Sequence, residues 1–379
     1  MAKRLIYIVS EDWVFVSHRL TLAKQAIKDG YDVTVITNIS NHEDVLLSAG
    51  LKVFNINFCR SFKRPFSDVH SIYQLIKLFR LLKPEVIHNV GLKISLISSI
   101  AAFIARVPVA INAYTGLGYV FSSNDMLARV IRLLLNSPLK YLNHRASTWV
   151  VFQNEDDEAL FENSNLINKE RTLLIKGSGV DVNEFPFSDE LPGQLKVMLA
   201  SRLLWDKGVG EFIEASRQLK ISYPEVTFVL VGDVDEQNPL SLTKEIIDSW
   251  VNEGFIEWWG HKQNMPEVLK LAHIVALPSY REGLPKVLLE AASIGRALVA
   301  TDAPGCREIV RDGVNGFLVQ AKESKCLAEA IEKLILNKEL RTQMGLKSRE
   351  IIETELSSEI INKQFIELYN SAIKLSGTE

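Results

Sequence analysis

The stretch IVALPSYREGLPKVLLEAASIGRALVAT, residues 274–301, contains a complete strand–loop–helix–strand unit. Its two ends, residues 274–277 and 298–301, are short apolar runs of the kind that form buried strands. Pro285 suits the first turn of the helix that the middle of the stretch predicts. Strands that alternate with helices in this way are typical of the doubly wound α/β class, in which helices cover both faces of a parallel sheet.

The same alternation extends in both directions from this unit. We expect further strands at residues 5–9, 32–37, 53–56, 86–88, 109–113, 148–152, 197–200, 226–231 and 256–259. The segment FPFSDELPGQ, residues 185–194, is rich in proline, glycine and acidic residues and predicts a linker. The predicted fold is a pair of Rossmann-like domains, residues 1–190 and 191–356, that face each other across a cleft. Residues 357–379 form a helix that the second sheet does not need, and we expect it to return to the first domain.

Composition agrees with this organisation. The chain has 379 residues, which is more than one hydrophobic core usually serves, and 47% of them are hydrophobic. Cys59, Cys306 and Cys326 are few and widely spaced, which fits a reducing compartment and neither a disulfide framework nor a zinc site. Glu11 and Asp12 end the first apolar run too early for a signal peptide. The longest apolar run, residues 94–105, is shorter than the ~20 residues of a membrane-spanning helix.

The net charge of −3 hides an asymmetry between the two parts of the chain. Residues 1–150 contain 18 Lys and Arg against 9 Asp and Glu, a net charge of +9, and the other 229 residues carry 25 against 37, a net charge of −12. A basic half predicts an anionic partner, for which nucleic acid and a lipid surface are both candidates. The cations interleave with Leu, Ile and Phe, which favours a membrane surface over a merely solvated helix face: Arg60, Lys63, Arg64, Lys77, Arg80, Lys83, Arg129, Arg132, Lys140 and Arg145.

Two loops at strand ends carry residues suited to chemistry. In SRLLWDKGV, residues 201–209, Arg202 and Lys207 lie in a strand-to-helix turn, with Gly208 where the helix should begin. Two cations beside the free amides of a helix start can neutralise a diphosphate and stabilise it as a leaving group. Taken alone, the same pair would more often be two solvated loop cations than an anion site.

The second loop carries Glu282 and, eight residues later, Glu290. Along a helix the two carboxylates would be roughly 12 Å apart, so they would address different parts of a long ligand. Glycosidases place their carboxylate pair only about 5 to 9.5 Å apart, so a glycosidase is disfavoured. Gly283 lets a ligand approach the backbone closely.

These motifs together resemble glycosyltransferase family 4. EGLPKVLLE, residues 282–290, is similar to the E-x7-E motif of that family, and RLLWDKGV, residues 202–209, to its R-x4-K phosphate clamp. GSGVD at 177–181 and DAPGCREIVRDGVNGFLV at 302–319 resemble its other conserved segments. The resemblance implies the GT-B fold and retention of anomeric configuration by same-face attack, with no metal, no cofactor and no side-chain nucleophile.

The resemblance also implies roles for single residues. Arg202 and Lys207, at the helix start marked by Gly208, would hold the diphosphate, and Glu290 the ribose hydroxyls. Glu282 would hold the donor sugar with the amides of Gly283, Leu284 and Pro285. The loop that contains His261 and Met265 would surround the base. The D-x-D at Asp233 and Asp235 imitates a metal motif of another glycosyltransferase fold, and we discount it because Arg202 and Lys207 already offset the diphosphate charge.

A narrower resemblance concerns the acceptor. SHR at 17–19, TGLGY at 115–119 and the run at 235–239 are similar to bacterial enzymes that extend undecaprenyl-diphosphate-linked sugars. It implies a UDP-sugar donor, first UDP-GalNAc or UDP-GlcNAc, and a polyprenyl-diphosphate-linked acceptor of O-antigen, lipopolysaccharide or related synthesis. The chain would work at the inner face of the bacterial cytoplasmic membrane, and nucleic acid would not be a partner. Acceptor-binding candidates lie at strand ends of the first domain: His18, Arg19, His88, Lys93, Thr115 and Gly116.

Other function classes fit the sequence less well. A nicotinamide-dependent oxidoreductase is disfavoured because the first strand leads into SEDWVFVSH and not into G-x-G-x-x-G. A two-lobed extracytoplasmic binding protein would need an export signal. A UDP-sugar epimerase of GT-B fold and a non-catalytic nucleotide-sugar-binding module stay open as alternatives.

Overall fold

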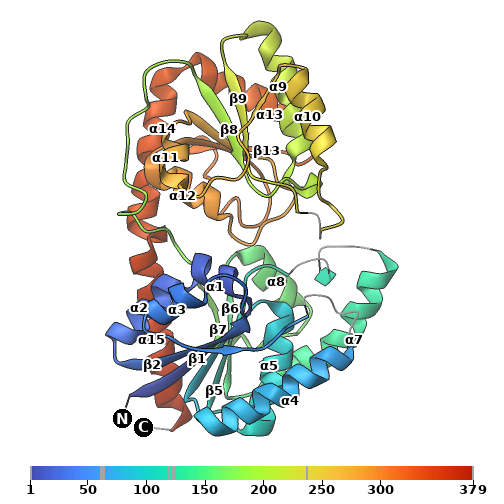
Figure 1. Cartoon of the computed structure of the whole chain (residues 1–379), viewed down its shortest axis with the longest axis vertical. Coiled ribbons are helices and arrows are strands. Elements are labelled where there is room, and N and C mark those ends of the chain that lie inside the picture. Colours follow the sequence, from blue (N-terminus) through green and yellow to red (C-terminus); the bar gives the residue numbers. More distant parts are fainter. Residues whose placement is uncertain (1, 60–64, 118–119, 122–124, 236–237, 378–379) are drawn as a thin grey trace. The chain divides into compact units, whose positions relative to one another are not determined.

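The computed structural model describes residues 2–59, 65–117, 120–121, 125–235 and 238–377. It divides into two compact units, one formed by Met1–Ser178 with Ile361–Glu379 and the other by Gly179–Ile360. Each unit is a parallel sheet with helices on both faces (Figure 1). Some residues of the sequence hypotheses lie outside the described parts of the chain: Arg60, Lys63, Arg64, Gly118, Tyr119, Glu236 and Gln237.

The first unit is built on a seven-stranded sheet of order β3-β2-β1-β4-β5-β6-β7. Its strands are β1 Lys3–Glu11, β2 Tyr31–Asn38, β3 Lys52–Asn55, β4 Val86–Val90, β5 Val109–Tyr114, β6 Thr148–Phe152 and β7 Thr172–Leu174. Its helices include α1 Asp12–His18, α2 Leu20–Lys28, α3 Glu43–Ser48, α4 Pro65–Leu82, α5 Leu92–Ala105, α7 Met126–Asn143 and α8 Glu155–Asn163. Alternate residues of β1 enter two different cores, Tyr7 on one face and Ile6 and Ile8 on the other, which explains why this strand is a continuous apolar run.

The last helix, α15 Ser358–Ser376, contributes to the core of the first unit. Phe365 and Tyr369 are buried there, and the Tyr369 hydroxyl lies 3.1 Å from that of Tyr7 and 2.6 Å from Nδ1 of His88. The first unit therefore takes part of its core from the opposite end of the chain.

The second unit is built on a six-stranded sheet of order β10-β9-β8-β11-β12-β13. Its strands are β8 Lys196–Ala200, β9 Thr227–Val231, β10 Glu257–Trp258, β11 Ile274–Leu277, β12 Ala297–Thr301 and β13 Gly316–Val319. Its helices include α9 Val209–Ser222, α10 Lys244–Asn252, α11 Met265–Lys270, α12 Lys286–Ile294, α13 Ser324–Leu336 and α14 Lys338–Ile351. Every strand expected from the sequence is present, and the two edge strands β7 and β13 were not expected.

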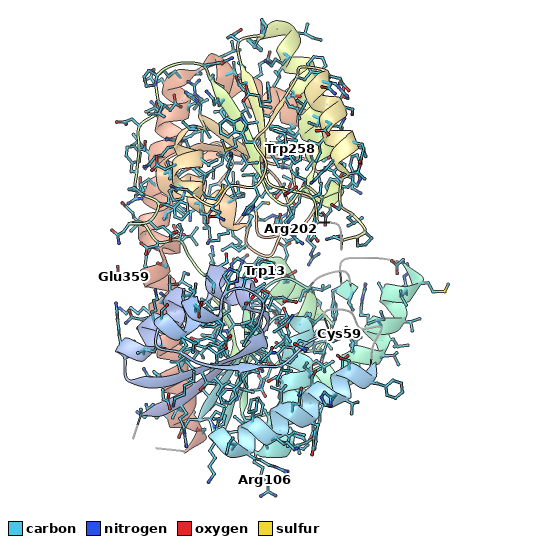
Figure 2. The ribbon with its side chains drawn as sticks, in the orientation of Figure 1. Trp13, Cys59, Arg106, Arg202, Trp258 and Glu359 are labelled. Atoms are coloured by element: carbon cyan, nitrogen blue, oxygen red, sulfur yellow. The ribbon has the colours of Figure 1, made fainter. Side chains whose placement is uncertain are left out.

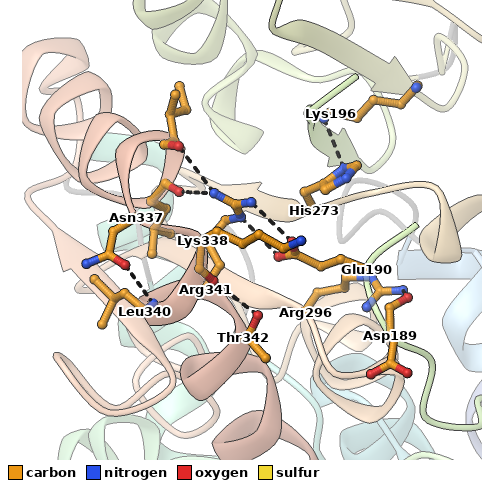
Figure 3. A network of polar contacts seen from close by, with 12 residues as sticks. Asp189, Glu190, Lys196, His273, Arg296, Asn337, Lys338, Leu340, Arg341 and Thr342 are labelled. Carbon is orange, nitrogen blue, oxygen red and sulfur yellow. Dashed lines mark hydrogen bonds and ion pairs between the residues drawn. The ribbon is translucent and has the colours of Figure 1, made fainter. Parts of the chain in front are cut away.

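The expected linker, residues 185–194, is bound to the second unit. Arg341 of α14 holds Glu190 in a bidentate ion pair, with Nε–Oε1 and Nη2–Oε2 distances of 3.0 and 3.1 Å (Figure 3). Arg296 donates to the Ser188 carbonyl at 2.7 Å, and Phe185 is buried in the core of the second unit. The division between the units therefore falls at Ser178, earlier than the proline- and glycine-rich composition indicated.

Candidate active site

A pocket of about 430 Å³ opens at the carboxyl ends of the second sheet. Its lining comes from the end of β8, from the loops after β9 and β10, and from α11 and α12. It includes Ser201, Arg202, Gly232, Asp233, Asp235, His261, Lys262, Met265, Val287 and Glu290. The strand order reverses between β8 and β11, and ligands of open α/β sheets bind at such a reversal. Figure 2 labels Arg202 at this edge of the second unit.

Two glycines allow the loops of this edge to approach each other. Gly208 caps α9 with a left-handed φ of 71°, and a Cβ there would collide with the Pro278 carbonyl. Gly232 has a φ of 131°, and a Cβ there would collide with the Ser201 carbonyl. Only glycine both adopts the positive φ easily and lacks the Cβ that would collide. Gly208 and Gly232 therefore allow the loops after β8, β9 and β11 to contact each other.

Lys207 and Glu282 form an ion pair at the start of α9. The Lys207 Nζ lies 2.5 Å from the Glu282 Oε1, and the side chains are only 17% and 13% exposed. The Tyr280 backbone N–H and the Ser279 hydroxyl both donate to the Asp206 carbonyl, and these hydrogen bonds fix the two loops to each other. A cation and a carboxylate from distant parts of the sequence therefore meet in a site that water reaches poorly.

Arg202 is also paired with a carboxylate. Its Nη1 lies 2.9 Å from the Asp235 Oδ2, and its side chain is half exposed. Asp235 belongs to the D-x-D that the sequence analysis discounted, and here its carboxylate faces a guanidinium.

Glu290 lies in the second turn of α12 and is almost fully buried at the pocket wall. Burial raises its pKa, and Lys286, whose Nζ lies 3.3 Å away, opposes that shift. Glu282 lies in the loop before the helix, since α12 begins at Lys286. The assumption of one continuous helix from Glu282 to Glu290, on which the expected separation was based, was therefore wrong.

The pocket brings together only some of the residues predicted to bind a donor. Arg202, His261, Met265 and Glu290 line it. The others lie on the neighbouring loops after β8 and β11: Lys207, Gly208, Glu282, Gly283, Leu284 and Pro285. Pro285 is the residue that precedes α12, with an extended φ of −73° and ψ of 113°.

Comparison with known proteins identifies the chain. The family described as "Glycosyl transferases group 1" matches residues 181–351, and the family "Glycosyl transferase 4-like" matches residues 4–154. The chain is a glycosyltransferase with a 4-like domain and a group 1 domain. It is 29% identical over 365 residues to the N,N'-diacetylbacillosaminyl-diphospho-undecaprenol alpha-1,3-N-acetylgalactosaminyltransferase of Campylobacter jejuni, covering 92% of this chain and 94% of that one.

Two further proteins are similar to this glycosyltransferase. The UDP-Gal:alpha-D-GlcNAc-diphosphoundecaprenol alpha-1,3-galactosyltransferase of Escherichia coli is 22% identical, over 82% of this chain and 81% of its own. The crystal structure of Anabaena HepE in complex with UDP superposes with a TM-score of 0.76 at 21% identity, covering 97% of this chain and all of that one. The likeness to HepE shows the GT-B fold.

The first unit of the glycosyltransferase carries the residues expected to bind an acceptor. His18 ends α1, Lys93 lies in the first turn of α5, and Thr115 and Gly116 follow β5. They follow the carboxyl ends of β1, β4 and β5, which are neighbours in the first sheet, so they gather at one edge. Lys93 is held there by Asp68, with an Nζ–Oδ1 distance of 2.7 Å.

Arg19 and His88 do not belong to this group, which corrects the sequence-based expectation. Arg19 is 1% exposed and donates to the Gly177 carbonyl at 3.2 Å, and its guanidinium stacks on Phe365 of α15. His88 is fully buried against Tyr369, and burial, with the Arg19 charge acting in the same direction, holds its pKa well below the ordinary value. Both are covered by α15, which the sequence predicted to return to the first domain, but the sequence did not indicate which side chains this helix would cover. Both side chains are packed inside the first unit and are shielded from solvent.

Asp12 is a residue that the sequence analysis missed. It is fully buried at the end of β1, and its carboxylate accepts from four backbone N–H groups, those of Trp13, Ser40, Asn41 and His42, and from the Ser40 hydroxyl. Burial alone would raise its pKa, but these hydrogen bonds outweigh it and lower the pKa to about 2. Asp12 therefore fixes the loop after β2 beside Trp13 at the carboxyl edge of the first sheet. The sequence signal that could have identified Asp12 is its place as an acidic residue at the end of the first apolar run.

Proposed function

We propose that this glycosyltransferase moves a hexose or N-acetylhexosamine from a UDP-sugar to a polyprenyl-diphosphate-linked saccharide, with retention of configuration. UDP-GalNAc and UDP-GlcNAc are the first candidates for the donor. The observation that carries the proposal is the poorly hydrated Lys207–Glu282 pair beside the pocket that Arg202 and Glu290 line. The acceptor class is supported by the two relatives whose names state undecaprenyl-diphosphate-linked acceptors.

In this proposal the donor spans the pocket and the loops next to it. Glu290, whose buried carboxyl lies on the pocket wall, accepts hydrogen bonds from the ribose hydroxyls. His261 and Met265, which line the same pocket, contact the base. Arg202 exchanges Asp235 for the diphosphate, and Lys207 exchanges part of its contact with Glu282. Glu282 is then available to a sugar hydroxyl, together with the amides of the loop before α12.

The reaction breaks the bond between the anomeric carbon and the diphosphate oxygen, and forms a bond from that carbon to an acceptor hydroxyl on the same face. The diphosphate leaves with an additional negative charge. Arg202 and Lys207 stabilise that charge, and the departing phosphate oxygen takes the proton of the acceptor hydroxyl. A preorganised cation in a site of low hydration, as Lys207 is here, stabilises such a developing charge far better than water does, so we propose that neither a metal ion nor a cofactor is required.

A product assay tests the donor and the acceptor. The full chain is incubated with UDP-GalNAc, UDP-GlcNAc, UDP-Gal or UDP-Glc and with undecaprenyl-diphosphate-linked monosaccharides, in the presence of EDTA. We expect one donor to give an extended lipid-linked product, whose anomeric configuration in NMR equals that of the donor. Sugar conversion without an acceptor would instead indicate an epimerase, and UDP binding with no product would indicate a binding module.

We also propose that the first unit docks on an anionic membrane surface, at the inner face of the cytoplasmic membrane. None of the helices in the described part of the chain has the length and hydropathy that a bilayer span needs. The amphipathic helix α7, however, exposes a stripe of large apolar side chains among its cations Arg129, Arg132 and Lys140: Met126, Val130, Leu133, Leu134 and Tyr141. Apolar side chains flanked by cations fit the interface of an anionic bilayer.

Vesicle sedimentation tests this surface. We expect the chain to bind phosphatidylglycerol vesicles at low salt and to leave them at high salt. Leu133→Ser/Leu134→Ser should lower the vesicle partition coefficient roughly a hundredfold, because each leucine loses burial worth about 1.5 kcal/mol. The control is Ile221→Ser/Leu336→Ser, which removes two similarly exposed side chains, 83% and 67%, from the second unit. Equal binding to neutral vesicles, or equal loss in both variants, contradicts the proposal.

A further inference from the structure

A second pocket lies in the first unit. It opens at the edge of the first sheet opposite to the edge where His18, Lys93, Thr115 and Gly116 gather. It has a volume of about 470 Å³ and is lined at the amino ends of β1, β4 and β5, between the carboxyl ends of α4 and α5. Figure 2 labels Arg106 at this edge and Trp13 at the opposite edge of the same unit. The transfer reaction proposed above uses no residue of this pocket.

The charges of this pocket are not balanced. Its one carboxylate, Glu85, is already bound by Arg4, with an Nη2–Oε1 distance of 2.7 Å and an Nε–Oε2 distance of 3.1 Å, and it also accepts from the Arg4 backbone N–H. Among the residues that the structure describes, Arg80, Lys83 and Arg106 have no hydrogen-bonding or ion-pairing partner for their side chains. Three unmatched cations therefore converge on one cavity.

Two of these cations occupy strained backbone positions. Lys83 follows the last residue of α4 and Arg106 follows the last residue of α5, with left-handed φ values of 47° and 61°. Glycine is the usual residue at this position after a helix, because a side chain is disfavoured at positive φ. Both helices carry a cation there instead, and both cations line the same cavity. Strain of this kind is concentrated at functional sites.

We propose that this basic pocket is an anion site that binds phosphate groups through Arg80, Lys83 and Arg106. Two guanidinium groups and an ammonium are the donor set that phosphate oxygens prefer, and the volume falls within the range of small-molecule sites. The phosphate could belong to a soluble polyphosphate or to a phospholipid headgroup. Leu81 and Ile104, 73% and 45% exposed beside these helix ends, would fit a headgroup at a bilayer.

A competing explanation is that the cations stabilise the carboxyl ends of α4 and α5, where the helix dipole is negative. The two explanations make opposite predictions for glycine. Lys83→Gly/Arg106→Gly keeps the left-handed turns and relieves their strain, so under the anion-site proposal the melting temperature stays or rises while phosphate binding is lost. If the cations serve only as helix caps, the melting temperature falls and phosphate binding does not change, which overturns the proposal.

Calorimetry on the full chain measures the site directly. Pyrophosphate is titrated into the protein in saturating UDP, so that the donor pocket is already occupied. Three proteins are compared: the wild type, the pocket variant Arg80→Gln/Lys83→Gln/Arg106→Gln, and the charge-matched control Lys24→Gln/Lys28→Gln/Lys363→Gln. The control residues are exposed cations of the same unit. We expect at least a tenfold loss of affinity in the pocket variant and less than a twofold change in the control.

Vesicles distinguish the two sources of phosphate. If the pocket variant no longer binds phosphatidylglycerol vesicles and the control still does, the ligand is a lipid headgroup. If vesicle binding is the same for both and pyrophosphate affinity falls only in the pocket variant, the ligand is a soluble polyphosphate. The proposal is overturned if the wild type binds neither probe, or if both variants bind both probes equally.

Discussion

Lys207→Gln lowers the rate of sugar transfer by roughly 10² to 10³, because it removes a preorganised positive charge from the departing diphosphate. Glu282→Gln is expected to lower the rate comparably, because the carboxylate that holds the donor sugar is lost. UDP release in the presence of the lipid-linked acceptor measures both effects. Full activity in either purified, folded variant would refute the assignment of the donor site to this pair.

The pair itself offers a sharper control. The two side chains are 2.5 Å apart and largely shielded from water, so each single variant leaves an unmatched charge and loses stability. The double variant Lys207→Gln/Glu282→Gln removes both charges and should recover most of the melting temperature without recovering transfer. If transfer returned with stability, the pair would be structural. Arg217→Gln, which breaks the exposed ion pair with Glu253 in the same unit, should leave transfer unchanged.

The second large effect concerns the stability of the first unit. Asp12→Asn is expected to lower the free energy of unfolding at pH 7 by about 2 kcal/mol, since a charged acceptor of several buried N–H groups becomes neutral. The amide cannot satisfy every donor: with its oxygen toward the N–H groups of Ser40, Asn41 and His42, its NH₂ opposes the N–H of Trp13.

The pH dependence of stability identifies the same carboxylate. The pKa of Asp12 is lowered to about 2 in the folded chain, so its contribution is complete above the unfolded pKa of about 4 and is lost as the pH falls toward 2. Urea unfolding of wild type and Asp12→Asn should therefore differ at pH 7 and converge near pH 2. Asp32→Asn, which removes an exposed ion pair with Lys52, is the control and should change stability by less than about 1 kcal/mol. A constant difference across this range contradicts the role of Asp12.

Much of the fold could be predicted because the relevant signals are local. The apolar runs before Arg202 and Glu282 form β8 and β11, and Gly208 lies where α9 begins. Doubly wound sheets place loops of this kind at one edge, so the pattern also predicted which residues would come near a ligand. The place of the expected linker depends on a distant contact, because Arg341 of α14 binds Glu190 in an ion pair, although the composition around Glu190 indicated a linker.

The sequence by itself determined the class of fold, the family and the residue types at the donor pocket, because strand periodicity, helix starts and glycine positions act over a few neighbouring residues. Only the tertiary structure decided that Lys207 meets Glu282, that Arg202 faces Asp235, and that Arg19 and His88 are buried beneath α15. These pairings join residues far apart in the chain, and whether a polar side chain is exposed or buried depends on which segment packs over it. That outcome is a property of the assembled cores and of no single stretch of sequence.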